Sequence, residues 1–256
     1  MLARQDKVAR IILVGPEEEI TQQIKDRKGD MDGITVQDPT NSPIIEELAQ
    51  LYYETRKHKG VTNEEASRLA QKPHVYAALL VKKGFADGTI GGAVETTGEI
   101  VRAAIQVIGT SDDTALVSSF FLILLCKEHH DKKGAYIFAD AGLVVHPTAD
   151  EMSEIACMSA KSYLDLVDDT PRIAMLSFST YGSSEHDAVS KVVTATDLVR
   201  KKDPHLLVDG ELQFDAAFVP DIAKSKASDS PLGGVVQKNL ADDQRDAPPA
   251  TRSATN

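Results

Sequence analysis

The residues best suited to chemistry lie at positions 86–108, in the stretch ADGTIGGAVETTGEIVRAAIQVI. This stretch predicts a loop rich in glycine and threonine that opens a helix near Thr97, because Thr96 and Glu99 have the spacing of a capping box. The apolar run Val75 to Val81 before it predicts a buried strand. A strand, a glycine-rich turn and a helix start place backbone N–H groups where they bind anions. The sequence therefore predicts an anion site here.

Arg102 lies about a turn and a half into this helix and off its expected apolar face. That face is formed by Ile100, Val101, Ala104, Ile105 and Ile108. Spacing alone leaves two interpretations. Arg102 is either a solvated arginine paired with Glu99 at i,i+3, which is common on exposed helices, or a cation of the anion site.

Two other clusters carry groups that could bind an anion. The run Arg56 to Gly60 (RKHKG) closes a predicted helix, where basic residues complement the helix dipole and glycine caps the end. The loop SFSTYGSS follows the strand expected at 172–176, and ligands of open α/β sheets lie beyond such strand ends. Its hydroxyls and flexible amides suit phosphate or phosphopantetheine, but it can equally be a turn that caps the next helix. The residues concerned are Ser177, Ser179, Thr180, Gly182 and Ser183.

The remaining elements predict an α/β protein. Strands at 9–14 and 34–38, with helices at 16–27, 44–59 and 64–72, indicate a parallel sheet covered by helices. The apolar runs 115–126 and 135–139 predict a hairpin and hence a mixed sheet. A second capping box at Thr148 and Glu151 begins a long helix, whose apolar stripe packs on its own sheet or forms a dimer face. A further helix is expected at 187–202 and a strand at 206–208 that ends at Asp209. The last helix is expected at 214–226, with an interruption at Pro220.

Composition excludes several classes of function. A net charge of -11 and a pI near 5.1 argue against a nucleic-acid-binding protein. The longest apolar run is too short to span a membrane, and the first residues lack the core of a signal peptide. Cys126 and Cys157 predict reduced core residues of a cytoplasmic protein, and no metal-ligand spacing is present. No G-x-G-x-x-G follows a strand, which disfavours a dehydrogenase.

Six ordered motifs resemble the phosphate acetyltransferase and phosphate butyryltransferase family, over about residues 10–231. The first motif consists of ADG, the following Gly/Ala pair, TT and an arginine. The other five are RKHKG, LVSSFF, PTADEMSEIA, MLSFSTYGS and VDGELQFDAA. The chain departs from the family at Glu95, where histidine is usual, and at Ala103, where proline is usual. Beyond Pro231 the sequence is aperiodic and polar, which predicts a disordered tail at 231–256 and a chain shortened at its carboxyl end. The family's serine, second arginine and aspartate would lie there, so the activity of the chain itself stays open.

The resemblance implies reversible acyl transfer between acetyl-CoA and inorganic phosphate by direct attack of the CoA thiolate. It also implies two α/β/α domains with a cleft between them, of the isocitrate/isopropylmalate dehydrogenase type, at 1–111 and 112–230, and a homodimer through the second. CoA is a substrate and no cofactor is expected. Arg56 and Arg102 fit the cation role, Thr96, Thr97 and the 177–183 loop fit the donor role, and no residue stands out as the base. The alternatives are a butyryltransferase or a catalytically incomplete relative that binds ligand or partner subunits.

Overall fold

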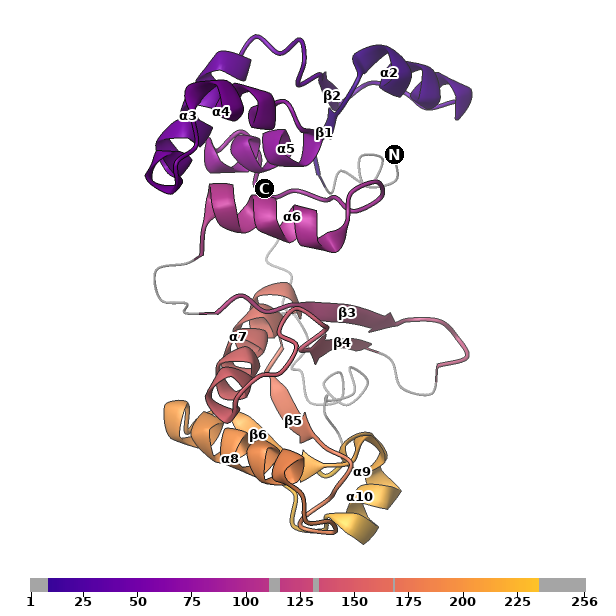
Figure 1. Cartoon of the computed structure of the whole chain (residues 1–256). Helices are drawn as coiled ribbons and strands as arrows, with labels where there is room; N and C mark the ends of the chain where they lie inside the picture. Colours follow the sequence, from indigo (N-terminus) through magenta and orange to yellow (C-terminus); the bar gives the residue numbers. More distant parts are fainter. Residues whose placement is uncertain (1–8, 111–115, 131–133, 168, 235–256) are drawn as a thin grey trace, which may run out of the picture. The chain divides into compact units, whose positions relative to one another are not determined.

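The computed structural model describes residues 9–110, 116–130, 134–167 and 169–234. The chain is an α/β protein that divides into two compact units, Met1–Asp113 and Thr114–Asn256 (Figure 1). The expected boundary between 111 and 112 lies two residues before this division. None of the helices in the described part of the chain is long and apolar enough to cross a membrane.

The first unit combines a small parallel sheet with a cluster of helices. Strands β1 (Ile11–Val14) and β2 (Ile34–Gln37) pair in parallel and are joined by α2 (Glu17–Asp26). Helix α3 (Ile45–Arg56) runs into a 3₁₀ turn that Gly60 ends in the left-handed conformation, as the basic run predicted. Its core is built by α3, α4 (Asn63–Ala70), α5 (Pro73–Lys82), the end of α6 (Thr97–Ala103) and the π-helical turn after it. Fully buried side chains in this core are Leu48, Tyr76, Leu79 and Val107.

The run Val75 to Val81 is helix α5, so the predicted strand is wrong. Pro73 occupies the first turn, where its missing N–H costs nothing, and the following alanines and leucines are strong helix formers. A short apolar run does not distinguish a strand from a helix that is buried on most sides. The glycine-rich loop therefore joins two helices, and the strand–turn–helix argument for an anion site fails.

Helix α6 (Thr97–Ala103) begins where the capping box predicted. It continues into a π-helical turn over Ala104–Ile108, which rotates the buried face relative to a regular helix. Ala103 and Val107 are buried, whereas Ile105 is 45% exposed, so the expected apolar face is wrong at that position. Arg102 is exposed and off the buried face, as expected.

The second unit holds an antiparallel hairpin and a parallel strand pair. Strands β3 (Phe120–Leu125) and β4 (Gly134–Ala139) pair in the predicted hairpin. Helix α7 (Ala149–Val167) leads to β5 (Arg172–Leu176), and α8 (Asp187–Lys202) crosses to β6 (Leu207–Leu212), which pairs with β5 in parallel. Helices α9 (Phe214–Phe218) and α10 (Pro220–Lys226) are separated before Pro220, as predicted.

Three expectations for this unit need correction. The strand ladders of the described residues form separate two-stranded sheets, so the hairpin does not join β5 and β6 in one mixed sheet. Strand β6 does not end at Asp209 but runs on to Leu212, which places the aspartate inside the strand. Cys126 is exposed rather than in the core, whereas Cys157 is half-buried, and burial raises the pKa of its thiol.

Packed structure also continues past the expected start of the tail. Leu232 is 2% exposed and packs in a cluster with Leu212, Ala216, Ala217 and Ala227. The described structure therefore extends to Gly234, and residues 235–256 of the expected tail lie outside the described residues.

Candidate active site

Thr96 is held in the capping box at the start of α6. Its hydroxyl donates to Glu99 Oε2 at 2.8 Å and accepts from the Glu99 backbone N–H at 3.3 Å. Glu99 Oε2 also accepts from the Thr96 N–H at 3.0 Å, and these hydrogen bonds from Thr96 lower the pKa of Glu99. The carboxylate of Glu99 thus takes donors that the sequence offered to phosphate. Thr97, next along the chain, is exposed.

Replacing Thr96 with alanine should lower the free energy of unfolding by about 0.5–2 kcal/mol, because the Glu99 N–H loses its cap. Thr96→Ser keeps the hydroxyl and should change stability by less than about 0.5 kcal/mol. Thr97→Ala is the matched control, one residue along and without a side-chain hydrogen bond among the described residues. Denaturant unfolding measures all three, and equal losses for Thr96→Ala and Thr97→Ala would contradict the capping role.

Glu95, where the sequence departs from the family pattern, contacts α5. Its Oε1 lies 3.3 Å from Nδ1 of His74, whose side chain is 9% exposed. The geometry is that of a close polar contact rather than a directed hydrogen bond, since His74 Nδ1 has no hydrogen-bond partner among the described residues. The contact ties the end of the glycine-rich loop to the first turn of α5. The missing family histidine is thus replaced by a carboxylate beside a different histidine.

The two predicted arginines belong to one unit, in which α3, the helix of Arg56, contacts the π-helical turn that follows α6, the helix of Arg102. Tyr52 of α3 donates from its hydroxyl to Gln106 Oε1 at 3.5 Å, across to the turn that follows α6. Arg56 lies one helical turn after Tyr52, and Arg102 lies one turn before Gln106. The Nε atom of Arg56 is buried and has no hydrogen-bond partner in the described part of the chain. A buried guanidinium donor without an acceptor is costly, so this nitrogen is suited to an anionic ligand.

The loop after β5 is folded around the carboxylate of Glu211. Glu211 is 3% exposed, and its Oε1 accepts from the Ser179 hydroxyl and from the Gly182 N–H, both at 2.8 Å. Ser183 Oγ lies 3.2 Å from Ser179 Oγ and accepts from the Thr180 N–H at 3.1 Å. Ser177 Oγ accepts weakly from the Ser179 N–H at 3.4 Å. The structure thus brings the predicted loop residues together, but two of their donors, the Ser179 hydroxyl and the Gly182 N–H, already donate to Glu211.

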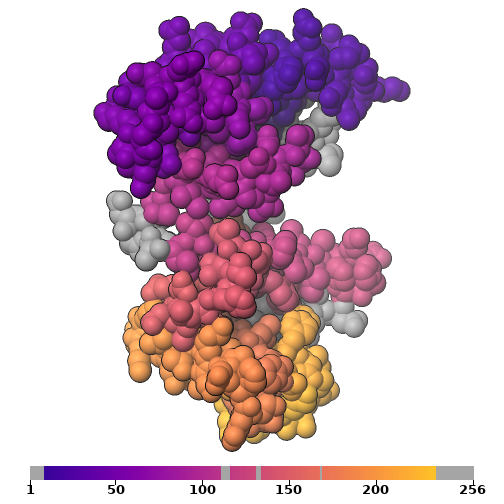
Figure 2. Space-filling view, in the orientation of Figure 1, coloured from indigo at the N-terminus to yellow at the C-terminus, as the bar shows by residue number. Residues whose placement is uncertain are grey.

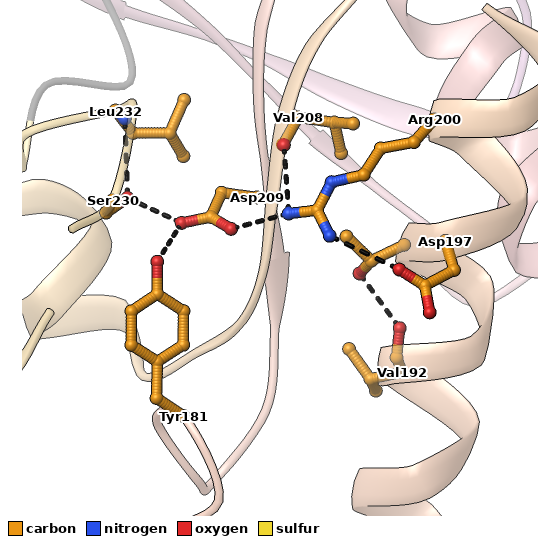
Figure 3. Close-up of polar contacts among 9 residues, drawn as sticks. Tyr181, Val192, Asp197, Arg200, Val208, Asp209, Ser230 and Leu232 are labelled. Atoms are coloured by element: carbon orange, nitrogen blue, oxygen red, sulfur yellow. Dashed lines mark hydrogen bonds and ion pairs between the residues drawn. The ribbon is translucent and has the colours of Figure 1, made fainter. Parts of the chain in front are cut away.

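Asp209 is the centre of a second buried network, which sequence reasoning missed (Figure 3). It is 2% exposed and accepts from the Tyr181 hydroxyl at 2.5 Å, from Ser230 Oγ at 2.6 Å and from Arg200 Nη2 at 2.8 Å. Arg200 also reaches the exposed Asp197, with 3.3 Å from Nη1 to Oδ1. Asp209 and Glu211 stand two residues apart in β6, whose pairing with β5 is irregular there, so a regular alternation of faces does not explain why both are buried. No local pattern in the sequence marks either residue as the acceptor of these hydrogen bonds.

The Tyr181 hydroxyl should make the protein less stable at alkaline pH. Burial and, second, donation to Asp209 raise the pKa of Tyr181 from 10.0 to about 12. Between pH about 10 and about 12 the folded state keeps a proton that the unfolded state has lost, so stability falls as pH rises. Below this range the contribution is fully present. Tyr181→Phe has no such proton. The difference in free energy of unfolding between the wild type and this variant, measured by denaturant unfolding, should therefore shrink across this pH range. A difference that stays constant would contradict the assignment.

Comparison with known proteins decides the family. The family model described as phosphate acetyl/butaryl transferase matches residues 2–237. The chain belongs to this family. Its members named phosphate acetyltransferase include one from Acetivibrio thermocellus, 44% identical over 227 residues, covering 89% of this chain and 68% of the relative. Another, from Paracoccus denitrificans, is 45% identical over 197 residues and covers 77% of this chain and 62% of the relative.

Solved structures of phosphotransacetylases have the same fold. The EutD phosphotransacetylase from Staphylococcus aureus aligns with a TM-score of 0.73 at 36% identity, over 87% of this chain and 66% of that protein. A phosphotransacetylase from Streptococcus pyogenes aligns with a TM-score of 0.73 at 35% identity, over 85% of this chain and 64% of that protein. The chain thus spans about two thirds of the length of these phosphate acetyltransferase relatives.

Proposed function

We propose that this chain acts in reversible acyl transfer between acetyl-CoA and inorganic phosphate, giving acetyl phosphate and CoA. The observation that carries the proposal is the family match over residues 2–237, together with relatives named phosphate acetyltransferase at up to 45% identity. These names favour acetyl over butyryl as the transferred group. The enzyme class is therefore that of an acyltransferase.

The chemistry needs cations for phosphate and donors for the oxyanion that forms when the thiolate of CoA attacks the acyl carbonyl. We assign the cation role to Arg56 and Arg102, because a guanidinium presents a bidentate fork to phosphate oxygens. The orphaned Nε of Arg56 and the exposure of Arg102 support this assignment. No acyl-enzyme intermediate is needed, since the thiolate itself is the nucleophile.

The donor role divides the predicted loop residues into two groups. Thr97 and Ser177 have hydroxyl hydrogens that no described acceptor takes, so we assign them to direct contact with substrate. Thr96 and the other loop residues have donors or acceptors engaged by Glu99, by Glu211 or by one another, and we assign them to shaping the two loops. That second group comprises Ser179, Thr180, Gly182 and Ser183.

A direct assay tests the proposed function. Purified protein is mixed with CoA and acetyl phosphate, and thioester formation is followed by its ultraviolet absorbance; butyryl phosphate is the comparison donor. Acetyl-CoA should form, and faster than butyryl-CoA. Faster transfer from butyryl phosphate would favour the butyryltransferase alternative. Saturable CoA binding without thioester formation would favour a relative that only binds ligand. If the protein shows no CoA binding and no turnover, both the acyltransferase and the ligand-binding proposal are contradicted.

We propose, in addition, that two copies of the chain associate through the second unit. Strand β3 exposes apolar side chains on both of its faces, among them Phe121 at 64% and Leu124 at 60%, and Figure 2 shows the hairpin projecting from its unit. Strand β3 carries no charge, so two copies can meet there despite a net charge of -11. Phe121→Asp should shift a dimer to monomer in analytical ultracentrifugation. An unchanged mass would exclude this face.

The sheet architecture and the cellular setting stay predictions. The likeness to phosphotransacetylase structures supports the proposed arrangement of each unit as a dehydrogenase-like α/β/α layer. Cys126 and Cys157 are both free, which is compatible with the reducing cytoplasm that the sequence predicted.

A further inference from the structure

A pocket of about 270 Å³ lies inside the second unit, between β4, α7, β5 and α9. Figure 1 shows these elements within that unit. The residues of both facing strands line it, from Ala135 to Asp140 and from Arg172 to Leu176. None of the predicted substrate residues is among the lining residues. The pocket is thus distinct from the groups assigned to acyl transfer.

Aromatic rings form one wall of this pocket in a continuous series. Tyr136 and Phe218 have ring centroids 5.4 Å apart, Phe218 and Phe214 stack at 5.2 Å, and Phe214 and Phe138 lie 6.0 Å apart. Helix α7 contributes three small residues and three larger ones, which are Ala156, Ser159, Ala160, Met152, Ile155 and Tyr163. A pocket lined by several aromatic rings and other apolar side chains is suited to an aromatic molecule, which can stack on the rings.

One residue that lines this apolar space carries a polar atom without a hydrogen-bond partner. The Oδ1 atom of Asp140, at the end of β4, is buried and has no hydrogen-bond partner among the described residues. A buried acceptor without a donor is unfavourable, so a ligand donor here would be well bound. Arg172 also lines the pocket, so the lining carries one acidic and one basic side chain whose charges balance. An uncharged ligand is therefore favoured over an ion.

We propose that this pocket binds a flat, uncharged aromatic molecule that carries one N–H or O–H donor, which Asp140 accepts. The size agrees with such a ligand, since an apolar cavity of about 150 Å³ holds benzene and this one is larger. A bicyclic ring with a single N–H, such as indole, matches both the volume and the polarity.

Indole and benzothiophene test the proposal, because the two have nearly the same shape and only indole has an N–H. The chain contains no tryptophan, so no intrinsic indole emission masks the fluorescence of bound indole. Indole should bind saturably at one site, and benzothiophene should displace it with about tenfold or more weaker affinity. Absence of saturable indole binding, or equal affinities for the two compounds, would overturn the proposal.

Two substitutions and one control variant localise the binding. Ala160→Leu fills the pocket and should abolish indole binding, whereas Lys161→Leu adds the same side chain to an exposed position outside the pocket and should not. Asp140 has a φ of 50°, which glycine tolerates, so Asp140→Gly should fold. In this variant the ratio of the affinities for indole and benzothiophene should fall to about one. Circular dichroism confirms folding of each variant. A preserved preference in Asp140→Gly, or indole binding in a folded Ala160→Leu, would contradict the assignment.

Discussion

Replacing Asp209 with alanine should lower the free energy of unfolding of the second unit by about 1–3 kcal/mol, because buried hydroxyl donors lose their acceptor. The carboxylate is 2% exposed and accepts hydrogen bonds from Tyr181, Ser230 and Arg200. Its removal leaves the hydroxyl groups of Tyr181 and Ser230 without this acceptor, whereas Arg200 keeps its contacts with Asp197 and with the carbonyl oxygen of Val208. The substitution also removes the hydrogen bond that ties Ser230 to β6, so the last described turns, held there by the apolar packing of Leu232, should loosen first.

Asp197→Ala is the matched control, because Arg200 contacts both aspartates. The side chain of Asp197 is 56% exposed, and exposed ion pairs contribute about 0–1 kcal/mol, so this variant should be nearly as stable as the wild type. Denaturant unfolding followed by circular dichroism measures both. Similar losses for the two substitutions would show that burial of Asp209 does not control the stability of the network.

Replacing Arg102 with alanine should reduce kcat/KM for CoA and acetyl phosphate by about 10- to 150-fold. This corresponds to loss of a charge-assisted contact worth about 1.5–3 kcal/mol. The fold should be retained, because the side chain is exposed and lies off the buried face of α6. Arg102→Lys keeps the charge but loses the bidentate fork and should give an intermediate rate.

Arg68→Ala is the matched control for Arg102→Ala, as both remove an exposed arginine from a helix of the first unit. The Arg68 side chain is 71% exposed and lies 4.0 Å from Glu65, so its loss should affect neither rate nor stability measurably. Steady-state kinetics and thermal unfolding are measured on both variants. If Arg102→Ala is destabilised while its kinetics match the wild type, Arg102 has a structural role and its assignment to phosphate is wrong.

Local signals explain why many elements were predicted from sequence alone. The capping boxes at Thr96 and Thr148, the break before Pro220 and the left-handed Gly60 each depend on residues within one turn of each other. Helix α8 begins and ends at the predicted residues for the same reason. Short apolar runs lack such signals, and there the strand predicted at Val75 to Val81 proved to be helix α5.

The sequence by itself determined the family, the order of most elements and the residue types available for phosphate. Only the tertiary structure decided which of those groups are engaged elsewhere. Ser179 is 32 residues from Glu211, and Tyr181 is 28 residues from Asp209, so no local pattern reveals that these carboxylates take their hydrogen bonds. A buried carboxylate must find its donors wherever the fold brings them, because water cannot supply them.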